Sequence, residues 1–279
     1  MMPGDKRRRL LQAESQAENL VKQLRITSFP INPIEIAEQH GILCKSEEIQ
    51  GFSGCLIKQG DTFGIIYSSK FDNDGFIRFT VAHELGHYFL PCHPELLFPQ
   101  GDGIHRSHNG FTSCDIHELE ADHFAAGLLM PRHLFTEALG EESILGFHAI
   151  EALSEKCKTS ITATAIRYAI FADHPVALVV SSNNRIEYSF MSDKMKTKIR
   201  EASWLTKGEG IPSQSQTAAF NEDPNNILSG RKIESVSYLD SWFSEAPSEE
   251  VSEDVVGLGQ YEKTLTVLFC EESLIYGEL

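Results

Sequence analysis

The chain has 279 residues, of which 41% are hydrophobic and 23% charged, a composition typical of a globular protein with one large domain or two modest ones. Its formal net charge of −16 disfavours a protein whose main task is to hold nucleic acid, because phosphate contacts need a basic surface. No apolar stretch is long enough to span a bilayer, and neither a signal peptide nor a C-x-x-C pair is recognisable. We therefore expect a cytoplasmic protein with reduced thiols and no membrane partner.

The N-terminal part is predicted to fold into two helices followed by short strands. Apolar residues recur near helical spacing over residues 5–25, and residues 33–40 form a short helix that Gly41 ends. Residues 42–69 alternate apolar stretches with glycine-bearing turns, which predicts two or three short antiparallel strands.

Two stronger helices follow, separated by a segment that is rich in glycine, proline and histidine. The first is predicted over residues 75–90 and the second over residues 115–129. The segment between them, residues 91–114, is expected to be a long loop.

The rest of the chain mixes helices and strands. Residues 143–172 predict further helices, and residues 175–190 predict a hairpin turned by Asn183 and Asn184. A stretch rich in Ser, Gln, Glu and Asn covers residues 208–226, and a strand near residues 263–271 closes the chain.

The helix over residues 75–90 contains His83-Glu84-Leu85-Gly86-His87, a match to H-E-x-x-H. Residues i and i+4 of a helix share one face, so His83 and His87 can present two imidazoles to one Zn²⁺ ion. Glu84 can then act as general base toward a water molecule that attacks a carbonyl. A structural histidine pair is the alternative, but the helical context and the acidic helix that follows favour a metal site.

A third protein ligand is needed, and His93 is the first candidate. It stands where the metzincin pattern H-E-x-x-H-x-x-G-x-x-H has its last histidine. That pattern places a glycine where this chain has Leu90, and Pro91 follows. Leucine tolerates a positive φ poorly, and a residue before proline is pushed toward extended backbone. The metzincin turn is therefore disfavoured, and His93 stays the alternative metal ligand.

The second candidate lies on the helix over residues 115–129. On a helical wheel Glu118 and Asp122 share the apolar face, whereas Glu120 falls among solvent-facing positions. A buried carboxylate pair without partners would be costly, and a zinc ion together with a ligand imidazole would supply those partners. We assign Glu118 as the third ligand and Asp122 as the acceptor that orients a ligand histidine. In the alternative interpretation the two carboxylates are surface charges.

Four stretches between about residues 10 and 135 have a distinctive order: PINPIEIAEQHGI, GFSGCLI, FTVAHELGHYFL and ELEADHFAAGLLMP. In order and spacing they resemble the ImmA/IrrE family of metallo-endopeptidases, which have a gluzincin-like zinc site. The resemblance implies a zincin-like fold, the ligands His83, His87 and Glu118, and the base Glu84. It also implies a partner, since family members cleave or otherwise inactivate a transcriptional repressor in bacterial stress responses or mobile-element control.

Thirty residues separate His87 from Glu118 and contain several groups that could stabilise an oxyanion. The choice among them stays open, and loop histidines are often merely exposed. The candidates are His93, His105, Arg106 and His108.

Residues 152–171 resemble the helix-turn-helix that some family members carry, but their few basic residues favour a packed helical pair, so direct nucleic-acid binding is not expected. Residues 175–279 resemble the C-terminal α/β region of longer members, which is a GAF-like sensor in one branch.

The sequence thus predicts an α+β chain in three parts. Residues 1–142 form a zincin-like metallopeptidase domain with a small antiparallel sheet, residues 143–174 a helical segment, and residues 175–279 an α/β sensor- or interaction-like domain. The expected function is zinc-dependent cleavage of a specific protein, a helix-turn-helix repressor. The alternative is a non-proteolytic protein that binds and sequesters such a repressor through the zincin fold.

Overall fold

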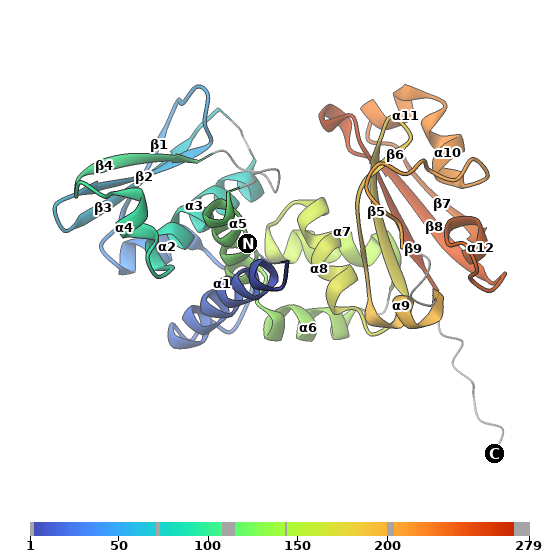
Figure 1. Ribbon diagram of the computed structural model, residues 1–279, viewed down its shortest axis with the longest axis horizontal. Helices are drawn as coiled ribbons and strands as arrows, with labels where there is room; N and C mark the ends of the chain where they lie inside the picture. Colours follow the sequence, from blue (N-terminus) through green and yellow to red (C-terminus); the bar gives the residue numbers. More distant parts are fainter. Residues whose placement is uncertain (1–2, 71–72, 108–114, 143, 200–203, 271–279) are drawn as a thin grey trace, which may run out of the picture. The chain divides into compact units, whose positions relative to one another are not determined.

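The computed structural model describes residues 3–70, 73–107, 115–142, 144–199 and 204–270. Over these ranges the chain is α+β, as predicted, with twelve α-helices and two separate sheets (Figure 1). It divides into two compact units, the first made of Met1–Glu137 with Ser154–Ser160 and the second of Ala138–Leu153 with Ile161–Leu279. No helix in the described ranges combines the length and apolar character needed to cross a membrane.

The first unit contains five helices and four strands, and α6 (Arg132–Glu141) leads out of it. In chain order these are α1 (Pro3–Gln23), α2 (Pro33–Gln39), β1 (Leu43–Glu47), β2 (Gly54–Gln59), β3 (Thr62–Ser68), α3 (Asp74–Phe89), α4 (His93–Leu97), β4 (Gly103–Ser107) and α5 (Ile116–Leu129).

The sheet of the first unit has the strand order β1-β3-β2-β4. β2 pairs antiparallel with both β3 and β4, but β1 pairs parallel with β3, from Leu43 opposite Gly64 to Glu47 opposite Ser68. The expectation of purely antiparallel strands is therefore wrong for β1. Strands that follow each other in sequence can pair antiparallel through a hairpin. β1 and β2 do run in opposite directions, but β3 lies between them, so they do not pair with each other.

The segment expected as one long loop is more ordered than its composition indicates. It contains the short helix α4 and the edge strand β4, which pairs with β2 from Gly54 opposite Ser107 to Lys58 opposite Gly103. Both were missed because each is only five residues long and β4 depends on a partner strand far away in sequence. Residues 108–114, which include His108, lie outside the described residues.

Helix α3 lies at the centre of the first unit. It contacts β2 and β3 of the sheet, and it also packs against α5, which in turn packs against α1 (Figure 1). Asn73 caps the start of α3 by accepting a hydrogen bond from Phe76 N, and Asp115 caps α5 in the same way through His117 N. Leu90 ends α3 in extended backbone, as the following Pro91 predicts.

The second unit is built on a five-stranded antiparallel sheet with the order β6-β5-β9-β8-β7. Asn183 and Asn184 adopt φ values of 50° and 56° at the predicted hairpin turn, which is confirmed. The strands are β5 (Val176–Ser182), β6 (Arg185–Met191), β7 (Lys232–Tyr238), β8 (Glu250–Gly257) and β9 (Thr264–Phe269). The helices that begin after α6 are α7 (Gly146–Cys157), α8 (Ile161–Phe171), α9 (Asp193–Ile199), α10 (Gln216–Asn221), α11 (Pro224–Leu228) and α12 (Leu239–Trp242), with a 3₁₀ turn at Gly259–Tyr261.

Candidate metal centre

Helix α3 presents His83 and His87 to one point inside the first unit. Both side chains are buried, and their Nε2 atoms lie 3.1 Å apart. The glycine of the motif, Gly86, faces α5 at close range: a Cβ atom there would lie 3.0 Å from Cα and 3.2 Å from O of Ala121. The small residue thus lets α5 approach, and α5 carries Glu118 to the two imidazoles.

The carboxylate of Glu118 completes a group of three. Its Oε2 lies 3.4 Å from Nε2 of His83, and its Oε1 lies 3.3 Å from Nε2 of His87. These are the only three His, Cys, Asp or Glu side chains in the described ranges that form such a group. Tetrahedral zinc with ligand bonds of about 2.0–2.1 Å requires ligand atoms roughly 3.3 Å apart. The spacing and the donor types therefore fit a zinc ion.

The charges of the three side chains are strongly coupled. Burial alone would lower the pKa of His83, but hydrogen bonds to Asp122 and Glu118 raise it to about 10. Burial lowers the pKa of His87 to about 3. Burial opposes ionisation of Glu118, yet the neighbouring imidazoles hold its pKa well below the usual range. A metal ligand must offer a lone pair, so His83 has to be neutral when it holds a metal ion.

Glu84, the expected base, is fully buried beside this group. By hydrogen-bond geometry neither of its carboxylate oxygens has a partner in the described part of the chain, although the nearby Ser107 hydroxyl partly opposes the rise in its pKa. Glu84 faces β2, because a Cβ atom added at Gly54 would lie 3.1 Å from its Oε1. Burial raises the pKa of Glu84 to about 7. An unpaired buried carboxylate is costly, so its presence here indicates a partner that is supplied by a metal site or substrate.

Asp122 lies where the sequence placed it. Its Oδ1 is 2.9 Å from Nδ1 of His83, and the side chain is buried. An Nδ1–H that donates to this carboxylate leaves Nε2 of His83 with its lone pair directed at the group of three. The structure therefore brings together all the residues proposed for the site on α3 and α5.

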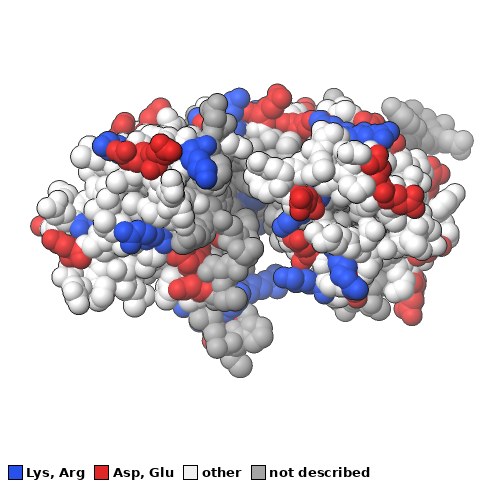
Figure 2. Space-filling view, turned by 90° about the horizontal axis from the view of Figure 1, so that it is seen from above, with Lys and Arg blue, Asp and Glu red and all other residues white. Residues whose placement is uncertain are grey.

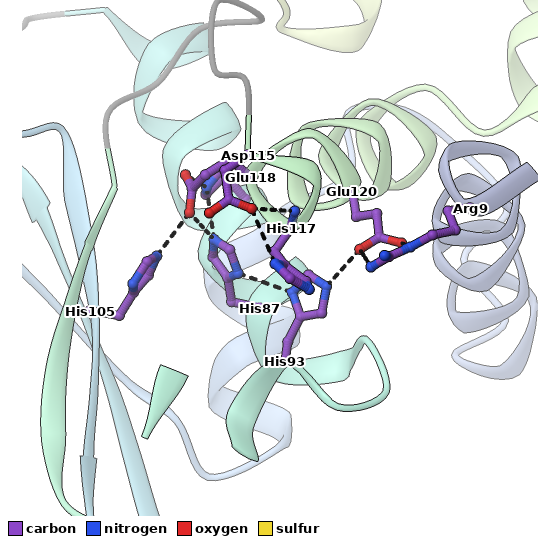
Figure 3. Close-up of polar contacts among 9 residues, drawn as sticks. Arg9, His87, His93, His105, Asp115, His117, Glu118 and Glu120 are labelled. Atoms are coloured by element: carbon purple, nitrogen blue, oxygen red, sulfur yellow. Dashed lines mark hydrogen bonds and ion pairs between the residues drawn. The ribbon is translucent and has the colours of Figure 1, made fainter. Parts of the chain in front are cut away.

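His93, the alternative ligand, does not lie with the group of three. It is buried at the start of α4, and its Nδ1 lies 3.1 Å from Nδ1 of His87, the nitrogen that faces away from Glu118 (Figure 3). Its Nε2 lies 3.1 Å from Oε2 of Glu120. The chain turns at Cys92, which has a φ of 67°, and this turn places His93. A positive-φ residue is therefore present after α3, but it lies two positions after Leu90, where the metzincin pattern has its glycine.

The expectation that Glu120 faces solvent is wrong. Its exposure is 7%, and its carboxylate bonds Arg9 of α1 on one side and His93 on the other (Figure 3). A helical wheel assumes a single buried face, but α5 is covered by α3 on one side and by α1 on another. The only sequence signal for a buried Glu120 was a basic residue, Arg9, in the N-terminal helix. Nothing in the sequence indicated that Arg9 pairs with Glu120.

Of the oxyanion candidates, His105 on β4 lies closest to the ligands. Its Nε2 is 3.0 Å from Oε1 of Glu118, and its ring centre is 4.6 Å from that of His87 (Figure 3). Arg106, the next residue along the strand, instead places its guanidinium 5.6 Å from the ring centre of Phe52. Among the described candidates, His105 thus faces the carboxylate of Glu118, whereas His93 lies behind His87; His108 lies outside the described residues.

Comparison with known proteins identifies the region that contains these residues. Residues 37–167 match the family model of the IrrE N-terminal-like domain. This part of the chain belongs to the ImmA/IrrE family of metallopeptidases. A search of curated proteins gave no significant match.

The ImmA/IrrE region contains all the side chains of the candidate metal centre, from α3 to α5. Among solved structures, a Mycobacterium tuberculosis transcriptional regulator is similar to this chain with a TM-score of 0.56. The alignment covers 93% of this chain and 76% of that chain at 11% sequence identity. At this identity the similarity concerns the fold alone. It extends beyond the ImmA/IrrE region.

Proposed function

We propose that the protein is a zinc-dependent endopeptidase, with His83, His87 and Glu118 as ligands and Glu84 as general base. The observation that carries the proposal is the buried carboxylate of Glu84, which lacks a hydrogen-bond partner among the described residues and lies beside three converging ligand atoms. A purely structural histidine pair would not require an unpaired carboxylate at its side.

The chemistry follows from these positions. When bound, zinc supplies a Lewis acid that polarises a peptide carbonyl and lowers the pKa of an attacking water molecule. Glu84, whose pKa is raised by burial to about 7, can accept that water's proton and return it to the leaving amine near neutral pH. Asp122 keeps the tautomer and orientation of His83 fixed, and His105 lies close enough to Glu118 to assist charge stabilisation at the site.

For the substrate we propose a specific cytoplasmic protein, a helix-turn-helix repressor whose removal serves a stress or mobile-element response. Membership of residues 37–167 in the ImmA/IrrE family supports this substrate class. The sensor-like role of residues 175–279 stays a prediction, as do the domain boundaries.

Two other functions make different predictions. A protein that sequesters a repressor without cleavage would not need the carboxylate of Glu84. A DNA-binding regulator would need a basic surface, but on the face shown in Figure 2 the Lys and Arg side chains are interspersed with Asp and Glu. The net charge of −16 also opposes it.

The test compares the wild type with Glu84→Gln in cells of the source organism that lack their own copy. New protein N-termini are identified by mass spectrometry, and zinc content is measured on both purified proteins. We expect one or a few new N-termini with the wild type, none with Glu84→Gln, and equal zinc content. The exposed Glu95→Gln on α4 is the matched control and should behave as wild type. Identical N-termini with Glu84→Gln and wild type would contradict the peptidase proposal.

A further inference from the structure

Side chains from four helices form a chain of contacts that begins at a proposed metal ligand and ends near the surface. It runs from His87 on α3 to His93 on α4, then to Glu120 on α5 and Arg9 on α1 (Figure 3). We propose that this relay positions His87, with His93 and Glu120 acting as positioning residues that keep the Nε2 lone pair of His87 directed at the metal. The inference rests on the proposed function only in taking the metal to lie at His83, His87 and Glu118.

The first step is the contact between two imidazoles. Nδ1 of His87 and Nδ1 of His93 are 3.1 Å apart, and both rings are buried. A hydrogen bond between two nitrogens needs one donor and one acceptor. With the Nε2 lone pair of His87 reserved for the metal, Nδ1 of His87 carries the proton and donates it to His93. His93 therefore takes the place that Asp122 has behind His83.

The second step fixes the tautomer of His93. Because its Nδ1 accepts a hydrogen bond, its proton lies on Nε2, which is 3.1 Å from Oε2 of Glu120. An ionised carboxylate can accept hydrogen bonds but cannot donate them. Both oxygens of Glu120 face the guanidinium of Arg9, at 2.5 Å from Nε and 2.6 Å from Nη2, and a carboxylate paired in this way is an acceptor for Nε2–H of His93. His93 thus has one available orientation.

The third step anchors the relay to the N-terminal helix. Arg9 bonds Glu120 with two parallel contacts, Nε to Oε1 at 2.5 Å and Nη2 to Oε2 at 2.6 Å. Paired contacts of this kind fix the plane of the carboxylate as well as its position. α1 therefore acts on His87 although it contributes no ligand, and the exposure of the Arg9 side chain, 32%, leaves this end of the relay near solvent.

The test measures zinc affinity by competition with a chromogenic chelator. His93→Ala removes the acceptor behind His87, and we expect zinc affinity to fall about 10- to 100-fold. His93→Asn keeps an oxygen that can accept and an amide that can donate, so it should recover part of the loss. His117→Ala is the matched control, because its ring lies 5.2 Å from that of His93 but its Nδ1 bonds Asp115 instead. It should bind zinc as the wild type does.

A second readout needs no variant. In the zinc-loaded wild type with ¹⁵N-labelled histidine, we expect a proton on Nδ1 of His87 and a two-bond nitrogen–nitrogen coupling to Nδ1 of His93. Absence of that coupling, or zinc affinity of His93→Ala within about twofold of wild type, would overturn the relay. Those results leave the proposed function intact, whereas a wild type that binds no zinc would contradict the proposed function itself. Weakened zinc binding in His93→Ala together with no proteolysis by the wild type would support the relay and contradict only the peptidase.

Discussion

Gly86 and Ala121 bring α3 and α5 together at the metal centre. A Cβ atom on Gly86 would lie 3.0 Å from Cα of Ala121 and 3.2 Å from Cβ of Phe124, closer than side chains normally approach. The same helix pair carries the ligands, since His83 and His87 stand on α3 and Glu118 on α5. The spacing of the ligand atoms therefore depends on the absence of a side chain at Gly86.

Gly86→Val tests this dependence. The added methyl groups would meet the backbone of α5, so we expect a loss of about 1–3 kcal/mol in stability and weaker zinc binding. Gly140→Val on α6 is the control, because a Cβ atom there would meet nothing within 4 Å. Urea unfolding and zinc titration of both variants provide the measurements. Wild-type zinc affinity in Gly86→Val would show that the helix spacing does not control the site.

Asp122→Ala leaves the buried Nδ1–H of His83 without its acceptor. An unsatisfied buried donor costs about 1–3 kcal/mol, and loss of such a partner typically lowers metal affinity about 10- to 100-fold. Asp122→Asn keeps one oxygen that can accept and should give a smaller loss. Chelator competition distinguishes these two variants. Equal zinc affinity of Asp122→Ala and wild type would show that Asp122 does not orient His83.

Glu118→Ala and Glu120→Ala separate a ligand from a positioning residue. Two imidazoles without the third ligand bind zinc poorly, so Glu118→Ala should lose stoichiometric zinc after dialysis. Glu120→Ala keeps all three ligands, and we expect it to retain zinc with reduced affinity. Metal content after dialysis checks both. Equal zinc content in the two dialysed variants would contradict the choice of Glu118.

The helical-wheel assignments of Glu118, Glu120 and Asp122 show how much of the site the sequence could predict. The H-E-x-x-H helix and the shared face of Glu118 and Asp122 follow from local periodicity, and the structure brings those side chains together. The burial of Glu120 does not follow, because it depends on α1 covering a second side of α5. No local pattern shows which distant helix will cover a surface.

The same limit applies to His93 and His105. Their residue types marked them as candidates, but their roles depend on the turn at Cys92 and on the pairing of β4 with β2. Both are long-range or positive-φ features that composition does not specify. The parallel pairing of β1 and β3 escaped prediction for a similar reason, since neighbours in sequence are not always neighbours in a sheet.

Asp254 predicts a pH dependence in the second unit. The carboxylate is buried on β8 and accepts a hydrogen bond from Phe147 N, and burial raises its pKa above 3.8. The folded protein therefore holds this proton more tightly than the unfolded chain. The corresponding stability is present at low pH and is lost as pH rises through the raised pKa.

Asp254→Asn cannot ionise and keeps an acceptor for Phe147. We expect its free energy of unfolding to rise relative to wild type as pH increases above the ordinary pKa of an aspartate, because only the wild type must then ionise a buried carboxyl or hold its proton. Tryptophan fluorescence during urea unfolding reports this unit, because both tryptophans of the chain, Trp204 and Trp242, belong to it. A difference between the two proteins that does not vary with pH would contradict the prediction.

The most direct test of the central claim is a crystal structure of the zinc-loaded protein with anomalous data collected on both sides of the zinc absorption edge. We predict one anomalous peak within about 2.0–2.2 Å of Nε2 of His83, Nε2 of His87 and a carboxylate oxygen of Glu118. His93 should lie behind His87, outside the coordination sphere, as in Figure 3. A zinc ion bound to His93, or no zinc at this group, would contradict the account.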